Sequence, residues 1–158
     1  MELILELEIP ASAEYIAIAR LVVSSLASAR RALADDRIDD LKLAVSEACT
    51  NAIEAHGVAA SDEHVRIRVW ENEVKLDIAV EDRGPGFDPE TLPEHPPVTD
   101  PERLHFERGL GIPLIRTLVD DVQFETSAKG TSVRMTVYGG PAELEPPEGL
   151  ISGEIELE

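Results

Sequence analysis

A carboxylate and an amide lie one turn apart in a segment that is predicted to be a helix. In residues 41–57, Glu47 and Asn51 share one face, separate from an apolar stripe at helical spacing. The Asn51 oxygen could bind a hard cation and Glu47 could accept a proton. A solvated face with one tolerated amide would have the same sequence, so both interpretations stay open. The apolar stripe consists of Ile38, Leu41, Ala44, Val45, Ala48 and Ala52.

A glycine-rich turn follows a predicted strand at Asp82-x-Gly84-x-Gly86. The two glycines flank Pro85 and form a tight, stiffened turn, where no Cβ keeps the backbone away from a flat ligand. An ordinary loop with an acidic start would have the same sequence. The motif alone therefore predicts a turn and permits a ligand site.

Glycines also precede a helix that is predicted from Pro113 to Val119. Arg108, Gly109 and Gly111 lie on the loop side of its start, and Pro113 fits only its first turn. Unpaired amides and the positive end of the helix dipole favour anions at such a position. In a chain of net charge −18, the segment is a candidate local site for phosphate groups.

Alternating apolar residues predict the strands that position these groups. Residues 2–9 alternate, with Leu3, Leu5, Leu7 and Ile9 on one side, and Pro10 ends the run. Two further runs, separated by Glu71-Asn72, predict an antiparallel hairpin, and two more strands follow the helix at Pro113. The alternating residues of these four strands are Val65, Ile67 and Val69; Val74, Leu76, Ile78 and Val80; Val122, Phe124 and Thr126; and Val133, Met135 and Val137.

Two more helices are predicted before the hairpin. Residues 12–34 have helical spacing, and Ser12 is the expected cap at their start. Asp36 or Asp39 is expected to cap the following helix, and Gly57 is placed to end it. Residues 88–108 contain five prolines and no apolar period, which predicts a long loop that is either a lid or disordered.

The composition favours one soluble domain and argues against two kinds of partner. The 158 residues are 43% hydrophobic, with 14 basic and 32 acidic side chains. Such a surface repels nucleic acid and anionic membranes, so neither is an expected partner. Cys49 is the single cysteine, which excludes an intrachain disulfide, and no stretch has the length of a membrane span. We therefore expect a cytoplasmic protein.

The composition changes after residue 138. Residues 139–158 contain six glutamates and three prolines but no lysine or arginine. We expect a folded domain over residues 1–138 and a flexible acidic tail over 139–158, in which Leu150-Ile151 and Ile155-Glu156-Leu157 could form a short strand on binding.

Four motifs in this order resemble those of the Bergerat-fold ATPases, the superfamily of gyrase, histidine kinases and MutL: Glu47 with Asn51, Asp82-x-Gly84-x-Gly86, Arg108-Gly109-x-Gly111, and Gly130-Thr131. Within it, SEACTNAIEAHG and ERGLGIPLI look most like the bacterial anti-sigma factor serine kinases. The resemblance covers about residues 1–138. It implies an α+β fold, a two-layer sandwich with helices on one face of a mixed, mostly antiparallel sheet.

The resemblance also implies a role for each matching residue. Asn51 corresponds to the Mg²⁺ ligand and Glu47 to the general base, which would accept the proton of an attacking serine hydroxyl. Asp82 corresponds to the carboxylate that accepts from the exocyclic amine of adenine. The remaining predicted nucleotide-binding residues are Gly84, Gly86 and Thr131 around the base, and Arg108, Gly109, Leu110 and Gly111 around the phosphates.

Two functions follow from the resemblance. In the first, the protein is an anti-sigma factor that uses ATP and Mg²⁺ to phosphorylate a serine on a STAS-type anti-anti-sigma partner, and so controls release of a sigma factor. In the second, it is a nucleotide-binding anti-sigma or partner-switch module with little or no kinase activity. The presence of Glu47 favours the kinase. A homodimer is expected by resemblance alone.

Overall fold

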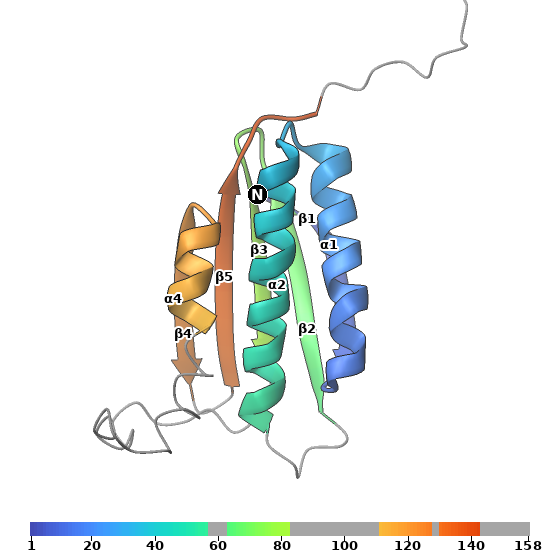
Figure 1. Cartoon of the computed structure of the whole chain (residues 1–158), viewed down its shortest axis with the longest axis vertical. Helices are drawn as coiled ribbons and strands as arrows, with labels where there is room; N and C mark the ends of the chain where they lie inside the picture. The colour runs from blue at the N-terminus through green and yellow to red at the C-terminus, as the bar shows by residue number, and fades with distance from the viewer. Residues whose placement is uncertain (57–62, 83–110, 128–129, 143–158) are drawn as a thin grey trace, which may run out of the picture.

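The computed structural model describes residues 1–56, 63–82, 111–127 and 130–142, which form a layer of helices on a five-stranded sheet (Figure 1). The elements are, in order, β1 (Glu2–Pro10), the 3₁₀ turn η1 (Ala13–Tyr15), α1 (Ile16–Arg30), α2 (Asp35–His56), β2 (His64–Glu71), β3 (Lys75–Asp82), α4 (Gly111–Leu118), β4 (Asp121–Ser127) and β5 (Gly130–Tyr138).

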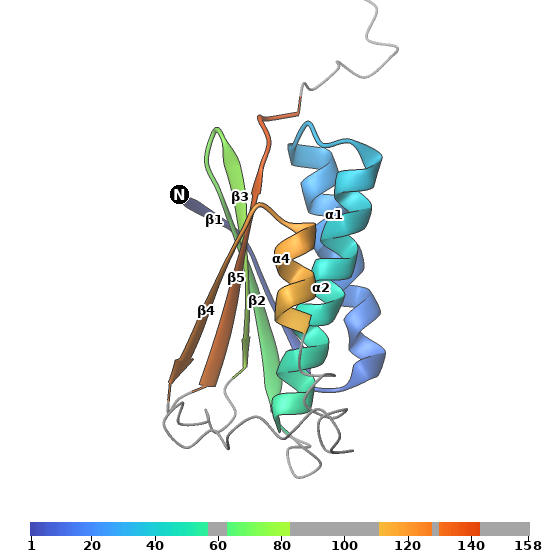
Figure 2. The same cartoon turned by 60° about the vertical axis from the view of Figure 1, so that its left-hand side comes forward.

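The sheet has the strand order β1-β2-β3-β5-β4, and every neighbouring pair in it is antiparallel. Helices α1, α2 and α4 lie on the same face of this sheet, as Figure 2 shows. The predicted α+β, two-layer fold is therefore confirmed. Where a mixed sheet was expected, the pairings in the described part of the chain are all antiparallel.

The apolar stripe predicted in α2 lies in the core. All six of its residues are at most 9% exposed, and they pack with the buried side chains of β2, β3 and β5. Such a stripe is what a helix needs to lie on one face of a sheet whose inward residues alternate. None of the helices in the described ranges combines the length and apolarity that a membrane crossing requires.

The start of β1 departs from the predicted alternation. Leu3 is 46% exposed, and Ile4 packs against the core in its place. The register with β2 shifts between Leu3 and Leu5, so one extra residue inverts the side-chain alternation at this point. A bulge of this kind leaves no mark in a sequence that alternates without interruption.

The hairpin between β2 and β3 closes through the side chain of Asn72. Its Oδ1 accepts hydrogen bonds from the backbone amides of Val74 at 2.9 Å and Lys75 at 3.0 Å. Val74, which the pattern assigns to the second strand, therefore lies in the turn and is 58% exposed. The Asx turn sets the first residue of β3.

The starts of the first two helices also differ from prediction. Ser12 makes no side-chain capping bond, because η1 precedes α1 and the regular helix begins only at Ile16. Helix α2 already begins at Asp35, so neither Asp36 nor Asp39 is its N-cap. Asp36 lies instead in the first turn, where a carboxylate stabilises the positive end of the helix dipole. Gly57 lies outside the described residues.

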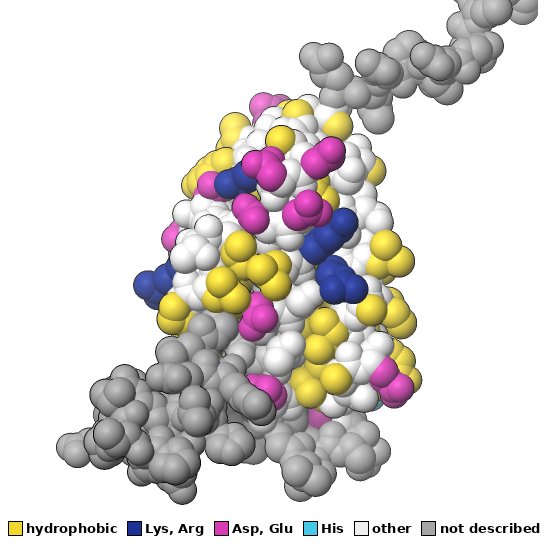
Figure 3. Space-filling view, in the orientation of Figure 1, with side chains coloured by type: hydrophobic (Ala, Val, Ile, Leu, Met, Phe, Trp, Pro, Cys, Tyr) yellow, Lys and Arg dark blue, Asp and Glu magenta, His cyan; other side chains and the backbone are white. Residues whose placement is uncertain are grey.

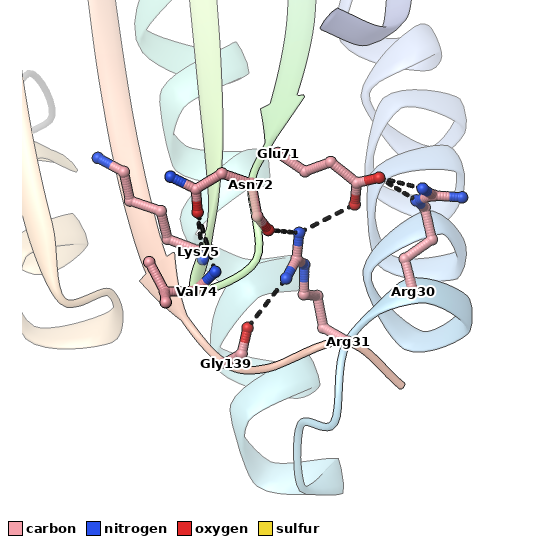
Figure 4. A network of polar contacts seen from close by, with 7 residues as sticks. All are labelled: Arg30, Arg31, Glu71, Asn72, Val74, Lys75 and Gly139. Carbon is pink, nitrogen blue, oxygen red and sulfur yellow. Dashed lines mark hydrogen bonds and ion pairs between the residues drawn. The ribbon is translucent and has the colours of Figure 1, made fainter. Parts of the chain in front are cut away.

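A buried arginine joins the end of α1 to the β2–β3 turn (Figure 4). Arg31, 4% exposed, donates to Glu71 Oε2 at 3.0 Å, to the carbonyl of Gly139 at 3.1 Å and to the carbonyl of Asn72. Arg30 donates through Nε to Glu71 Oε1 at 2.8 Å. Two guanidinium groups thus neutralise one carboxylate.

Backbone hydrogen bonds hold the chain that follows β5 in the same place. The amide of Ala32 donates to the carbonyl of Gly140 at 3.0 Å, and the amide of Ala142 donates to that of Arg30 at 2.9 Å. The hydrogen-bonded chain therefore continues past residue 138, where the sequence places the domain boundary.

Candidate functional site

The second half of α2, the end of β3, and the starts of β5 and α4 lie at one end of the domain. This end is at the bottom of Figures 1 and 2, opposite the β2–β3 turn. Antiparallel pairing of β3 with β5 and the packing of α4 on α2 bring these segments together. They carry Glu47, Asn51, Asp82, Thr131 and Gly111, which are half of the predicted site residues.

Glu47 and Asn51 are half-buried residues of α2. Lys42 and Ser46 line a groove between α1 and α2. Glu47 lies five residues after Lys42, and Asn51 lies five residues after Ser46. A spacing of five residues places each of the two roughly 140° around the helix from the groove. Because α1 and α4 flank α2 on opposite sides, Glu47 and Asn51 lie on the α4 side (Figure 1). The predicted pair therefore shares one edge of the helix.

The side-chain amide of Asn51 is buried but has no partner. Neither Oδ1 nor Nδ2 makes a hydrogen bond to any described residue. Buried polar atoms are nearly always paired in native proteins, because an unpaired one costs roughly 1–3 kcal/mol. Asn51 is also a poor helix former at a mid-helix position. These two costs make Asn51 a candidate ligand-binding residue, as predicted.

Asp82 and Thr131 are direct partners in the pairing of β3 with β5. Asp82 is 6% exposed and continues the alternate residues Ile78 and Val80, which lie in the core under the helices. Thr131 continues the corresponding face of β5, with buried Val133. Both side chains therefore face the helix layer, at the end of the sheet that lies near the end of α2.

The backbone at Gly130 supports this arrangement. Its φ angle is 139°, a region that residues with a Cβ rarely adopt. This glycine begins β5 and lies opposite Ser127 of β4. It therefore sets the direction in which the chain enters the position of Thr131.

Helix α4 begins at Gly111, and Pro113 lies in its first turn as predicted. Ile115 and Val119 are buried in the core, which fixes the helix on the sheet next to α2. Its N-terminal amides and the positive end of its dipole therefore lie at the same end of the domain as Asn51.

The other predicted site residues cannot be placed. Gly84, Gly86, Arg108, Gly109 and Leu110 lie outside the described residues, and so does the predicted loop 88–108. Their roles stay predictions. In the part of the chain that the structure describes, no three His, Cys, Asp or Glu residues form a metal-binding cluster.

The single thiol of the chain is not a reactive group. Cys49 lies between Glu47 and Asn51 in sequence but points into the core, where it is fully buried. Burial raises the pKa of this thiol to about 12. Because the thiolate is the reactive form, Cys49 is inert at neutral pH.

One exposed surface was not predicted from the sequence. A groove between α1 and α2 contains Leu21, 65% exposed, and Leu43, 44% exposed. Helical periodicity predicts which residues face inward, but it does not show which apolar residues outside that stripe stay uncovered. No signal in the sequence would have found this groove.

Comparison with known proteins shows the family of this chain. Residues 9–137 match the model of the histidine kinase-like ATPase domain family. Serine-protein kinase RsbW of Bacillus velezensis is 40% identical over 141 residues, covering 85% of this chain and 84% of that protein, and RsbW of Bacillus subtilis is 38% identical over 138 residues with the same coverage.

Solved structures show the same fold at lower identity. A crystal structure of RsbU and RsbW domains from Mycobacterium tuberculosis has a TM-score of 0.58 and 19% identity, covering 90% of this chain and 35% of the other. The mycobacterial sensor histidine kinase MprB has a TM-score of 0.52 and 16% identity, covering 87% and 100%. The fold and the site thus define a histidine kinase-like, ATP-binding domain. Within that class, this chain belongs to the RsbW family of serine-protein kinases.

Proposed function

We propose that the protein is an anti-sigma factor that uses ATP and Mg²⁺ to phosphorylate a serine of a STAS-type anti-anti-sigma partner. Membership in the RsbW serine kinases and the presence of Glu47 support a catalyst over a passive nucleotide-binding module. The buried, unpaired amide of Asn51 is the observation that carries the nucleotide site.

Asn51 would hold Mg²⁺ through Oδ1. Mg²⁺ prefers oxygen ligands, and it usually takes one or two from protein and the rest from phosphates and water. A buried amide oxygen without a protein partner has the donor chemistry that this requires. When bound, the ion would neutralise charge on the phosphates.

Glu47 would act one turn earlier on the same edge of α2. During transfer, the serine oxygen bonds to the γ-phosphorus while the bond from that phosphorus to the bridging oxygen breaks, and ADP leaves. The serine proton passes to the carboxylate of Glu47. Glu47 is half-buried, which is compatible with access of a docked serine to its carboxylate.

Asp82 would select adenine. An ionised carboxylate accepts hydrogen bonds and cannot donate them, so it suits the exocyclic amine of adenine and opposes the carbonyl of guanine. Thr131, its partner across the strands, would add a hydroxyl at the same edge of the base. Arg108 with the amides of Gly109, Leu110 and Gly111 would hold the phosphates, while Gly84 and Gly86 would let the backbone pass near the base.

Phosphorylation explains how the partner would be exchanged. A phosphoserine carries close to two negative charges, and this chain carries a net charge of −18. Repulsion would release the phosphorylated partner, and the acidic surface would then favour a basic patch on the sigma factor. In this scheme the active protein is a cytoplasmic homodimer that binds neither DNA nor membrane.

Two measurements test the proposal in order. Thermal shift with ATP, ADP and GTP, each with and without Mg²⁺, should show stabilisation by adenine nucleotides only, with a larger effect of Mg²⁺ on ATP. Radiolabel transfer to a purified STAS partner should then fall by about 10²-fold or more in Glu47→Gln, since general bases contribute that much.

Glu54→Gln is the matched control, because Glu54 is an exposed carboxylate further along the same helix. Transfer should be retained in this variant. Absence of any nucleotide shift would refute the ATP site. A shift without transfer in the wild type would instead identify the non-catalytic partner-switch module.

A further inference from the structure

The groove between α1 and α2 is an uncovered, partly apolar surface of about 600 Å³. Leu21 and Leu43 face it from the two helices and are 65% and 44% exposed. Figure 3 views this side of the molecule and shows yellow apolar side chains beside dark-blue basic ones over the helix layer. Large exposed apolar residues that gather in one groove indicate a binding surface.

The charge of the groove is opposite to that of the protein as a whole. Arg20 and Lys42 line it, and among the described residues that line it Asp39 alone is acidic. Lys42 and Asp39 are 3.6 Å apart as an exposed pair within one helix, which contributes little. Arg20 makes no ion pair with any described residue. The groove therefore suits an acidic segment that also carries apolar side chains.

Such a segment begins at the C-terminal end of α1, whose earlier turns line the groove. The amide of Ala142 is hydrogen-bonded to the carbonyl of Arg30, the last residue of α1. Residues 143–158 follow, with six glutamates, no basic residue, and apolar side chains at Leu150, Ile151 and Ile155-x-Leu157. Charge and apolar content thus complement those of the groove.

The reach of this segment is sufficient. Leu21 lies nine residues before Arg30 in α1, which corresponds to about 14 Å along the helix axis. Residues 143–158 can span roughly 50 Å when extended. Because the segment is tethered, docking would be intramolecular, at an effective concentration in the millimolar range for a short flexible link.

We propose that residues 143–158 dock into the α1–α2 groove of their own chain. The glutamates pair with Arg20 and Lys42, and the apolar residues cover Leu21 and Leu43. High salt weakens the contact, because its ion pairs are exposed.

A spin label on the full chain tests this contact. Cys49 is buried and its pKa is raised to about 12, so a nitroxide reagent at neutral pH is directed to a new cysteine, Glu158→Cys. Amide signals of the groove, around Leu21 and Leu43, should lose intensity through paramagnetic relaxation. The loss should disappear at high salt.

Charge reversal on either side of the contact should also remove the intensity loss. Arg20→Glu with Lys42→Glu changes the groove, and Glu154→Lys with Glu156→Lys changes the segment while leaving the folded body untouched. Arg116→Glu, an exposed arginine of α4, is the matched control and should keep the loss.

Three results would overturn the proposal. One is full signal intensity at the groove in the labelled wild type. Another is an intensity loss that survives both charge reversals. The third is a loss that appears equally in an unlabelled, isotope-enriched chain mixed with labelled chains, which would show that the segment contacts a second copy.

Discussion

The two ends of this domain treat buried polar groups in opposite ways. At the turn end, Arg31 donates to three acceptors, and among its nitrogens only Nε is buried without a described partner (Figure 4). At the site end, both polar atoms of the Asn51 amide are buried and unpaired within the described chain. The buried arginine at the turn end joins three segments of the chain, whereas the buried amide of Asn51 is free to bind the proposed ligand.

The turn end is therefore expected to affect mainly the stability of the domain, and the site end mainly ligand binding. A buried arginine that joins α1, the β2–β3 turn and the chain after β5 contributes to the folded state directly, and removing it leaves unpaired acceptors. An unpaired buried amide lowers the stability of the folded protein, and the proposed ligand would remove this cost. Substitutions at the turn end should therefore change the free energy of unfolding, and substitutions at the site end should change nucleotide affinity.

The largest effect is expected from Arg31→Met, which breaks the turn end. The variant removes one of the two arginine partners of buried Glu71 and a donor to the carbonyls of Asn72 and Gly139, and we expect the free energy of unfolding to fall by about 3 kcal/mol. Nucleotide affinity of the folded protein should not change. Urea denaturation and nucleotide titration below the transition measure the two quantities.

Arg37→Met is the control for this prediction. Among the described residues, Arg37 makes one ion pair, with Asp120 at 2.7 Å, and both side chains are about one-third exposed. Its loss should cost less than about 1 kcal/mol. Equal losses in the two variants would contradict a special role for the buried arginine.

A somewhat smaller effect is expected from Asn51→Ala, which changes the site end. Mg²⁺-dependent ATP binding should weaken by about 10²-fold, since a bound cation contributes several kcal/mol to the charge balance at phosphates. The free energy of unfolding without nucleotide should stay the same or rise by about 0.5 kcal/mol, because alanine is the better helix former.

Isothermal titration with ATP and Mg²⁺, together with urea denaturation, tests Asn51→Ala. Ser46→Ala, on the opposite side of α2, serves as the control and should retain binding. Wild-type affinity in Asn51→Ala would exclude the metal role, and a large loss of stability would mean that the amide has a structural partner.

The smallest expected effect is a dependence of stability on pH, which comes from Glu71 at the turn end. The hydrogen bond from Arg30, followed by the attraction of both arginines, holds the pKa of Glu71 below its ordinary value of 4.5. The ionised form is thus favoured by folding. Its contribution to stability is complete above pH 4.5 and is lost as the pH falls through the lowered pKa of the folded state.

Melting temperatures between pH 7 and pH 3 measure this contribution. Acidification below pH 4.5 should lower the melting temperature of the wild type more than that of Glu71→Gln, which has no carboxylate to protonate. Parallel curves for the two proteins would show that Glu71 does not titrate between the folded and unfolded states in this range.

Much of the fold could be predicted, because each element carries its own periodic signal. The apolar stripe of α2 is buried at every predicted position, and the alternating runs of β2, β3 and β5 form paired strands with buried inward residues. Local patterns fail where one residue changes the register or the start of an element. Such places are the bulge after Leu3, the 3₁₀ turn after Ser12, the start of α2 at Asp35 and the start of β3 after Val74.

The site could be predicted only in part. Glu47 and Asn51 share a helix edge because their spacing alone determines it. Asp82 and Thr131 are far apart in sequence, and the pairing of β3 with β5 makes them neighbours. The ordered motifs and the resemblance predicted the family, which the RsbW relatives confirm, while the roles of the single residues stay predictions.

The sequence by itself determined the helices and most strand positions, the excess of acidic residues and the order of the motifs, because these depend on residue type and on spacing within one element. Tertiary structure decided which groups are left unpaired and which are saturated. The amide of Asn51, the contacts of Arg31 with Glu71 and Gly139, and the open groove beside Leu21 depend on which segments meet across the fold. Such contacts join residues that are far apart in the chain, and the periodic pattern within one element does not predict them.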